Sequence, residues 1–146
     1  MKVLIQRVTQ ASVTVSGECV GNIGPGLLVF VGIEKTDDQE IASKAIDRLL
    51  RYRVFEDEAG KTNLSVQDIK GEMLIVSQFT LVADTGKGLR PSFSRGATPQ
   101  QAEALFDFMV AYARGLNKVG IETGQFGADM KVSLLNDGPV TFIMEL

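Results

Sequence analysis

Short apolar runs, some of them alternating with polar residues, dominate the first quarter of the chain and predict strands. Turn-forming residues such as Gly, Pro and Ser separate these runs, and they interrupt regular structure for local backbone reasons. The expected strands are 2–8, 12–15, 19–23 and 27–31. Because four strands follow one another before any helix, the pattern indicates an antiparallel meander.

A helical pattern comes next, with apolar residues at Ile41, Ala45, Leu49 and Leu50. This spacing places them on one face of an amphipathic helix. We expect Asp37 to cap the N-terminus of this helix, with Glu40 three residues later completing a capping box. We expect the helix to end near Arg51 or Tyr52.

A second and longer helix is predicted from Thr98 onwards. Thr98 should be its N-cap, Pro99 fits its first turn, and Gln101 should complete a capping box. Its apolar face contains Ala102, Leu105, Phe106, Met109, Val110 and Ala113. We expect Gly115 to stop it.

The remaining apolar runs are short and predict further strands, with a loop at 61–65. Strands are expected at 53–55, 73–76 and 119–122, and a terminal hairpin is expected from 130–135 and 142–146 around a turn at 136–141. The whole pattern predicts an α+β fold. A mainly antiparallel β-sheet or barrel should carry the two amphipathic helices on one side, in a single domain of residues 1–146.

The composition excludes several kinds of chemistry. The chain has 146 residues, a net charge of −3, one cysteine and no histidine. A Ser-His-Asp triad, a Cys-His pair and a histidine general base are therefore impossible, and a zinc site is disfavoured. We expect no metal and no cofactor, and we interpret Cys19 as a small core residue. No apolar run is long enough to span a membrane, so we expect a cytoplasmic protein.

Asn136–Thr141 is the first stretch that could carry function. Its Gly138 would let another molecule approach the backbone closely, and its Pro139 lacks an N–H and can follow a cis peptide bond. The residues alone favour an ordinary turn with a trans bond, because only about 5–6% of X–Pro bonds in folded proteins are cis.

Ser77–Leu81 is the second candidate stretch, at the end of the buried run 73–76. It places Ser77, Gln78 and Thr80 where a core strand ends, a common border of a cleft. The alternative interpretation is that Ser77 and Thr80 only satisfy neighbouring backbone groups.

The segment 83–97 has no apolar period and reads as a long loop. It contains Lys87, Arg90 and Arg95 together with Phe93, and Asp84 is its only acidic residue. Cations with an aromatic ring could contact the phosphates and a base of a nucleic acid. A solvated loop is the equally weighted alternative.

Ser77-Gln78-Phe79-Thr80-Leu81 and Asn136-Asp137-Gly138-Pro139-Val140-Thr141 together resemble the D-aminoacyl-tRNA deacylase family. The resemblance extends along the whole chain through further stretches: 6–8, 11–15, 24–28, 90–94 and 126–130. It implies an enzyme that hydrolyses the ester between a D-amino acid and the terminal adenosine of tRNA. The family also removes glycine from mischarged tRNA.

The resemblance also implies how the site is assembled. Family members are homodimers with active sites at the subunit interface. The Gly138-Pro139 bond would be cis and would enter the partner's site, where its carbonyls would contact the substrate's amino group. Asn136 belongs to the same substrate-binding turn, and Arg7 would hold the turn in place. Ser77, Gln78, Phe79 and Thr80 would form the catalytic segment, and Lys87, Arg90 and Arg95 are expected to contact the tRNA.

Two mechanisms remain open for the hydrolysis. Thr80 could be a nucleophile, but the sequence offers it no usual general base. Alternatively, the neighbouring ribose 2′-hydroxyl could assist while backbone N–H groups around Phe79 and Thr80 stabilise the oxyanion, and we prefer this mechanism. The competing functions are a non-catalytic RNA-binding module and, less favoured, a general esterase.

Two positions depart from the family pattern. Thr62 stands where the family commonly has methionine, and Gln125 stands where an arginine often precedes Phe-Gly-Ala-Asp. We expect Thr62 to alter the lining of the pocket and Gln125 to remove a positive charge.

Overall fold

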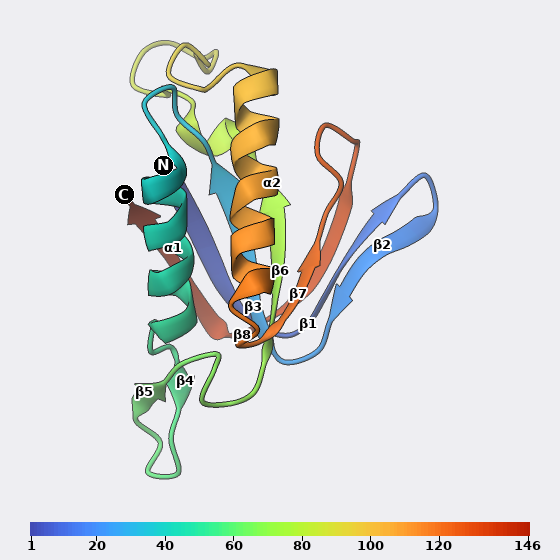
Figure 1. The fold of residues 1–146 in the computed structure, drawn as a ribbon, viewed down its shortest axis with the longest axis vertical. Helices are drawn as coiled ribbons and strands as arrows, with labels where there is room; N and C mark the ends of the chain where they lie inside the picture. Colours follow the sequence, from blue (N-terminus) through green and yellow to red (C-terminus); the bar gives the residue numbers. More distant parts are fainter.

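A strongly curved mixed sheet forms the centre of the computed structural model, which describes all residues 1–146 (Figure 1). The hydrogen-bonded path through the sheet is β2-β1-β3-β6-β7. β2 and β3 both pair with one edge of β1, and β8 pairs with its other edge. The strands are β1 (Lys2–Val15), β2 (Glu18–Ile23), β3 (Gly26–Gly32), β6 (Glu72–Ser77), β7 (Gly120–Thr123) and β8 (Lys131–Glu145).

β1 joins the two strands expected at 2–8 and 12–15 into one. Its first half pairs with β3 and its second half with β2, both antiparallel, so β2 and β3 follow one another along the same edge. The polar residues Thr9 and Gln10 between the two expected strands are exposed within this continuous strand.

The expected terminal hairpin is wrong. Residues 131–145 form the single strand β8, whose two arms both pair with β1 and not with each other. Asn136 lies opposite Val8 and Thr141 lies opposite Gln6, so residues 137–140 bulge out of the ladder. The long edge of β1 explains the difference, because it offers ladder partners to both arms.

β3, β6 and β7 run parallel to one another, whereas the pairings of β1 are antiparallel. Parallel strands covered on both faces are apolar throughout, which explains the unbroken run Met73–Val76. The sheet curls until β2 approaches β7, where a Cβ on Gly21 would collide with the Thr123 carbonyl oxygen. The result is a nearly closed barrel, and the expected α+β class is confirmed.

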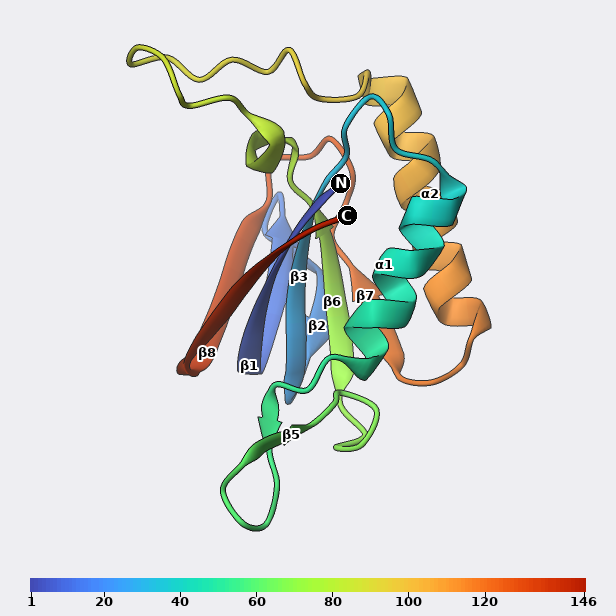
Figure 2. The ribbon, with the colours of Figure 1, turned by 90° about the vertical axis from the view of Figure 1, so that its left-hand side faces the viewer.

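Two helices, α1 (Gln39–Arg51) and α2 (Pro99–Gly115), lie side by side on one face of the sheet (Figure 2). Alternate residues of β3 face different layers. Leu27 and Val29 join the main core beneath the helices, and Leu28 joins a smaller core inside the curved sheet. The expectation of helices on one side is therefore confirmed.

The N-cap of α1 is Asp38 rather than Asp37. The Asp38 carboxylate accepts a hydrogen bond from the Ile41 N–H at 2.9 Å. Asp37 is buried and is used elsewhere, since it accepts bonds from the Met1 ammonium at 2.7 Å and the Glu34 N–H at 2.7 Å. A sequence pattern cannot distinguish adjacent aspartates when one of them is recruited by a distant positive charge.

Both ends of α2 agree with the predicted bounds, but the contacts at each end differ. Thr98 accepts from the Gln101 N–H at 3.2 Å, but the Gln101 side chain donates to the Lys35 carbonyl instead of completing a capping box. Gly115 is the last residue of the helix as expected, but the positive φ that follows the helix end belongs to Asn117, at 51°.

The smaller differences concern short elements and Cys19. A hairpin of β4 (Phe55–Glu56) and β5 (Thr62–Leu64) projects from the fold, although 61–65 was expected to be a loop. Cys19 lies in β2 as expected but is exposed, so it is not a core residue. None of the helices is both long and apolar enough to traverse a membrane.

Candidate active site

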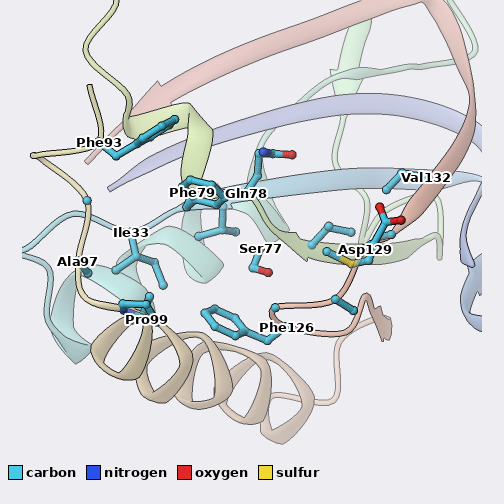
Figure 3. Close-up of a pocket in the computed structure, with 17 residues that line it drawn as sticks. Ile33, Ser77, Gln78, Phe79, Phe93, Ala97, Pro99, Phe126, Asp129 and Val132 are labelled. Atoms are coloured by element: carbon cyan, nitrogen blue, oxygen red, sulfur yellow. The ribbon is translucent and has the colours of Figure 1, made fainter. Parts of the chain in front are cut away.

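A pocket of about 570 Å³ opens at the ends of β3 and β6 (Figure 3). The start of α2 and the segment between β7 and β8 complete its wall. The lining is mostly apolar and comprises Val31, Ile33, Val76, Ser77, Gln78, Phe79, Phe93, Gly96, Ala97, Pro99, Ala102, residues 126–130 and Val132. A concave apolar site with a few polar groups is the usual form of a small-ligand pocket.

Three of the four expected catalytic residues line this pocket. Ser77 ends β6, and its side chain faces the same space as the Phe126 ring (Figure 3). The Gln78 N–H donates to the Val31 carbonyl at 2.8 Å, which ties the end of β6 to β3. Phe79 then begins the 3₁₀-helix η1 (Phe79–Val82).

The start of η1 leaves backbone donors free within the helix. The first hydrogen bond of η1 runs from the Leu81 N–H to the Gln78 carbonyl, and no side chain caps the N-terminus. The N–H groups of Phe79 and Thr80 therefore have no acceptor within the helix. These are the two donors that would stabilise the oxyanion in the mechanism assisted by the 2′-hydroxyl.

Thr80, which is exposed, differs from its three neighbours because it does not line the pocket. Its hydroxyl oxygen accepts a hydrogen bond from the Gln78 side-chain amide. An amide cannot remove a proton from a hydroxyl, so this contact does not activate Thr80 as a nucleophile.

The segment Phe126–Met130 forms one wall of the pocket, a role that its sequence did not predict. The Phe126 ring packs 6.0 Å from that of Phe106 on α2, which fixes its position. The signal in the sequence was an aromatic residue inside a Gly-rich stretch between two strands. Such a stretch reads equally well as a plain turn.

The Asn136–Thr141 loop is the second region of the candidate site. Its Gly138-Pro139 bond is cis, as the family resemblance implied, and Gly138 has a φ of 133°. The Asn136 side chain closes the loop, because it accepts from the Val140 N–H at 3.1 Å and donates to the Thr141 hydroxyl at 2.9 Å.

Arg7 anchors this loop from the neighbouring strand β1. Its Nε donates to the Asp137 carbonyl at 3.0 Å, and its Nη1 donates to the Val54 carbonyl at 2.8 Å. The same guanidinium lies 3.6 Å from the Asp137 carboxylate. Arg7 thus contacts the loop as the sequence analysis expected, from a side chain that is only 10% exposed.

The pocket borders the carboxyl ends of β3 and β6, and the loop forms the bend of β8, at the opposite end of the sheet (Figure 2). Asn136 pairs with Val8, which pairs with Gly26 at the start of β3, whereas the pocket lies at Val31 near the end of that strand. Five residues of extended chain correspond to roughly 16 Å. Accordingly, none of the loop residues, and not Arg7, lines the pocket of the same chain.

The three loop cations differ in their surroundings. Lys87 and Arg90 are exposed and form no ion pair, but Arg95 pairs with Glu34 at 3.1 Å. Glu34 also accepts from the Met1 ammonium at 2.9 Å. That hydrogen bond, followed by the charges of Arg95 and Lys2, holds the pKa of Glu34 below its ordinary value of 4.5 against the opposing effect of burial.

The two departures from the family pattern lie outside the pocket wall. Thr62 is exposed on β5, and Gln125 is exposed before Phe126. The expectation that Thr62 alters the lining is therefore wrong for the pocket of its own chain.

Sequence comparison assigns the chain to a family. The family described as D-Tyr-tRNA(Tyr) deacylase matches residues 4–145. The chain belongs to the D-aminoacyl-tRNA deacylase family. It is 59% identical to the D-aminoacyl-tRNA deacylase of Cronobacter sakazakii and 56% identical to that of Escherichia coli O1:K1, with both chains of each pair covered completely. Members of this deacylase family are hydrolases.

Solved structures support the same deacylase fold. A c-Myc DNA unwinding element binding protein is similar with a TM-score of 0.93 and 41% identity, over 100% of this chain and 99% of that one. A probable eukaryotic D-amino acid tRNA deacylase matches with a TM-score of 0.88 over 99% of this chain and 98% of that one. At 18% identity, the second likeness concerns the fold alone.

Proposed function

We propose that this deacylase hydrolyses the ester bond of D-aminoacyl-tRNA, and of mischarged glycyl-tRNA, to release the free amino acid and tRNA. The observation that carries the proposal is the pocket at the strand ends, which combines Ser77, Gln78 and Phe79 with a mostly apolar wall. The terminal adenosine with its ester would enter this pocket. Such a substrate is met in the cytoplasm, where we expect the protein to act.

The complete site is proposed to form between two copies of the chain. The Asn136–Thr141 loop lies too far from its own pocket to serve it, so it would enter the pocket of a partner. β8 is an edge strand with exposed apolar side chains, among them Leu135, Phe142 and Ile143. Exposed strand edges and exposed apolar residues both favour association.

The loop would then select the configuration of the amino acid. A rigid backbone surface next to the ammonium group can distinguish the two configurations of a Cα, because the hydrogen and the side chain exchange places between them. In this proposal the Gly138 and Pro139 carbonyls accept from that group, and an L side chain would collide with the wall. Glycine has no side chain to exclude, which explains its acceptance.

The chemical step requires little assistance because an aminoacyl ester is already activated. Water attacks the ester carbonyl carbon, the bond to the ribose oxygen breaks, and the leaving oxygen takes up a proton. The Phe79 and Thr80 N–H groups would stabilise the oxyanion, and the ribose 2′-hydroxyl would relay the proton. The exposed position of Thr80, outside the pocket wall, supports this mechanism over nucleophilic attack by Thr80.

Hydrolysis of D-tyrosyl-tRNA and L-tyrosyl-tRNA by the purified protein tests the proposed activity. We expect the D ester to be hydrolysed and the L ester to be spared. Equal hydrolysis would indicate an unspecific esterase. Binding of tRNA without hydrolysis would favour a nucleic-acid-binding module, the function that the name of the c-Myc DNA unwinding element binding protein states for that protein.

Mixing two variants of strongly reduced activity tests the shared site. Gly138→Ala damages the loop, and Ala102→Phe fills the pocket that Ala102 lines. In a mixed dimer, one site combines an intact pocket with an intact loop, so hydrolysis of the D ester should return on mixing. A mixture whose activity stays at the level of the separate variants, although sedimentation shows mixed dimers, would refute a site shared between subunits.

A further inference from the structure

Two exposed phenylalanines meet at the mouth of the pocket. Phe79 of η1 is 64% exposed and Phe93 of the 83–97 loop is 45% exposed. Their ring centroids lie 5.2 Å apart with the rings inclined by 56° (Figure 3). Aromatic side chains usually contribute their large apolar area to a core or an interface. A pair that leaves this area in solvent therefore indicates a binding surface.

The loop holds Phe93 in place through backbone hydrogen bonds. Asp84 and Ser92 exchange a pair of bonds at 2.8 and 2.9 Å, and the Gly96 N–H donates to the Phe93 carbonyl at 3.1 Å. The Ala97 N–H donates to the Ile33 carbonyl at 3.0 Å, which joins the loop to the end of β3. The aromatic pair is thus positioned before any ligand arrives.

The charge around this pair points to the chemistry of the ligand. The chain carries a net charge of −3, yet the loop that contains Phe93 holds Lys87 and Arg90, both without acidic partners. Proteins bind single-stranded nucleic acid with cations that contact its phosphate backbone and with aromatic rings on which its bases stack. A purely apolar partner would not need the cations.

We propose that the Phe79–Phe93 pair stacks the penultimate base of the single-stranded 3′ end of the tRNA. This inference rests on the proposed function, because the pocket then holds the terminal nucleoside and the strand must leave across the pocket mouth. The backbone N–H of Phe79 would stabilise the oxyanion at the ester, and its ring would stack on the penultimate base. The loop cations would contact the phosphates that follow.

A comparison of two substrates distinguishes stacking of the penultimate base from a contact between Phe93 and the terminal nucleoside in the pocket. D-tyrosyl-tRNA carries a penultimate base, and D-tyrosyl-adenosine does not. Loss of one stacked base weakens binding by about tenfold. In Phe93→Leu we expect the KM for D-tyrosyl-tRNA, relative to the KM for D-tyrosyl-adenosine, to rise by about this factor, and we expect Phe93→Tyr to restore the ratio.

Leu89→Ala is the matched control, since Leu89 is a fully exposed apolar residue of the same loop. It should leave the ratio at the wild-type value. An equal change of KM for both substrates in Phe93→Leu would overturn the proposal, because the ring would then contact the terminal nucleoside or only shape the pocket.

A binding measurement separates this proposal from the proposed function. The probe is a tRNA 3′ end with 2-aminopurine in place of the penultimate base, whose fluorescence reports stacking. Wild type should change the fluorescence, and Phe93→Leu should not do so at saturating protein. An unchanged signal with bound wild type overturns the stacking role even if the ester is hydrolysed. A wild type that hydrolyses neither ester refutes the proposed function alone.

Discussion

The pocket and the Asn136–Thr141 loop are built in opposite ways. The pocket lies at the ends of the buried strands β3 and β6, and the backbone bond from Gln78 to Val31 sets its geometry. The loop bulges from the edge strand β8, is largely exposed, and is held mainly by the side chains of Arg7 and Asn136. The pocket should therefore tolerate changes of side chain better than the loop does. We expect the largest functional losses from substitutions in the loop.

Gly138→Ala should have the largest effect. A Cβ at Gly138 would lie 2.7 Å from Val140 Cγ2 and 3.1 Å from the Arg7 guanidinium, at a φ of 133° that disfavours L residues. We expect kcat/KM for D-tyrosyl-tRNA to fall about a hundredfold, the effect of misplacing a contact by about 1 Å.

Gly17→Ala is the control for Gly138→Ala, since Gly17 also has a positive φ but no atom within 4 Å of the new Cβ. It should keep wild-type kcat/KM. Equal losses in both variants would show that backbone strain, and not the loop, limits the activity.

Glu34→Gln should weaken the anchor of the 83–97 loop, because Glu34 joins Arg95 to the Met1 ammonium. We expect the free energy of unfolding at pH 7 to fall by about 1–2 kcal/mol, as for a charge-assisted hydrogen bond near the surface. The pKa of Glu34 is lowered in the folded protein, so its stabilisation is complete above 4.5 and is lost as the pH falls through the folded value.

Urea unfolding of wild type and Glu34→Gln between pH 3 and 7 measures this difference in the free energy of unfolding. The difference between the two proteins should be constant from pH 5 to 7 and should shrink below pH 4.5. A difference that grows on acidification would contradict the assigned ion pair.

Neutralising the loop cations should weaken tRNA binding moderately and change its salt dependence. Each phosphate contact to a single strand contributes about 0.7 to the slope of log K against log salt. Replacing Lys87 and Arg90 with glutamine should make this salt dependence less steep. Adding Arg95→Gln should reduce the steepness by a smaller amount, because Arg95 already pairs with Glu34. Titrations at several salt concentrations measure this, and an unchanged slope would place the contact elsewhere.

Thr80→Ala should have the smallest effect. Thr80 lies outside the pocket wall and receives a hydrogen bond from an amide that cannot act as a base. We expect kcat for the D ester to stay within about tenfold of wild type, because in the proposed mechanism only the backbone groups at this position serve the reaction. A fall below about a thousandth, the effect of losing a catalytic group, would establish Thr80 as a nucleophile.

The sequence predicted local elements well wherever a periodic apolar pattern and a cap agreed, as in α2. It failed where a distant partner decided the outcome. Asp37 is taken up by the Met1 ammonium, so Asp38 caps α1. The turn residues 136–141 indicate a hairpin, but the long edge of β1 keeps both arms in one strand.

The candidate site was predictable in its parts and not in its assembly. The motif at Ser77–Thr80 and the loop at Asn136–Thr141 could be recognised from their residues and from the family resemblance. Nothing in the spacing of the chain shows that Phe126 and Ala102 share a wall with Ser77, or that the loop lies at the opposite end of the sheet. Those relations depend on how β3, β6 and α2 pack.

The separation of loop and pocket by the length of β3 has a consequence for kinetics. If every working site needs two chains, the concentration of sites at high dilution varies with the square of the protein concentration. Activity per milligram would then fall in proportion to concentration below the dissociation constant of the dimer. The fold would thus couple the rate of proofreading to the abundance of the protein itself.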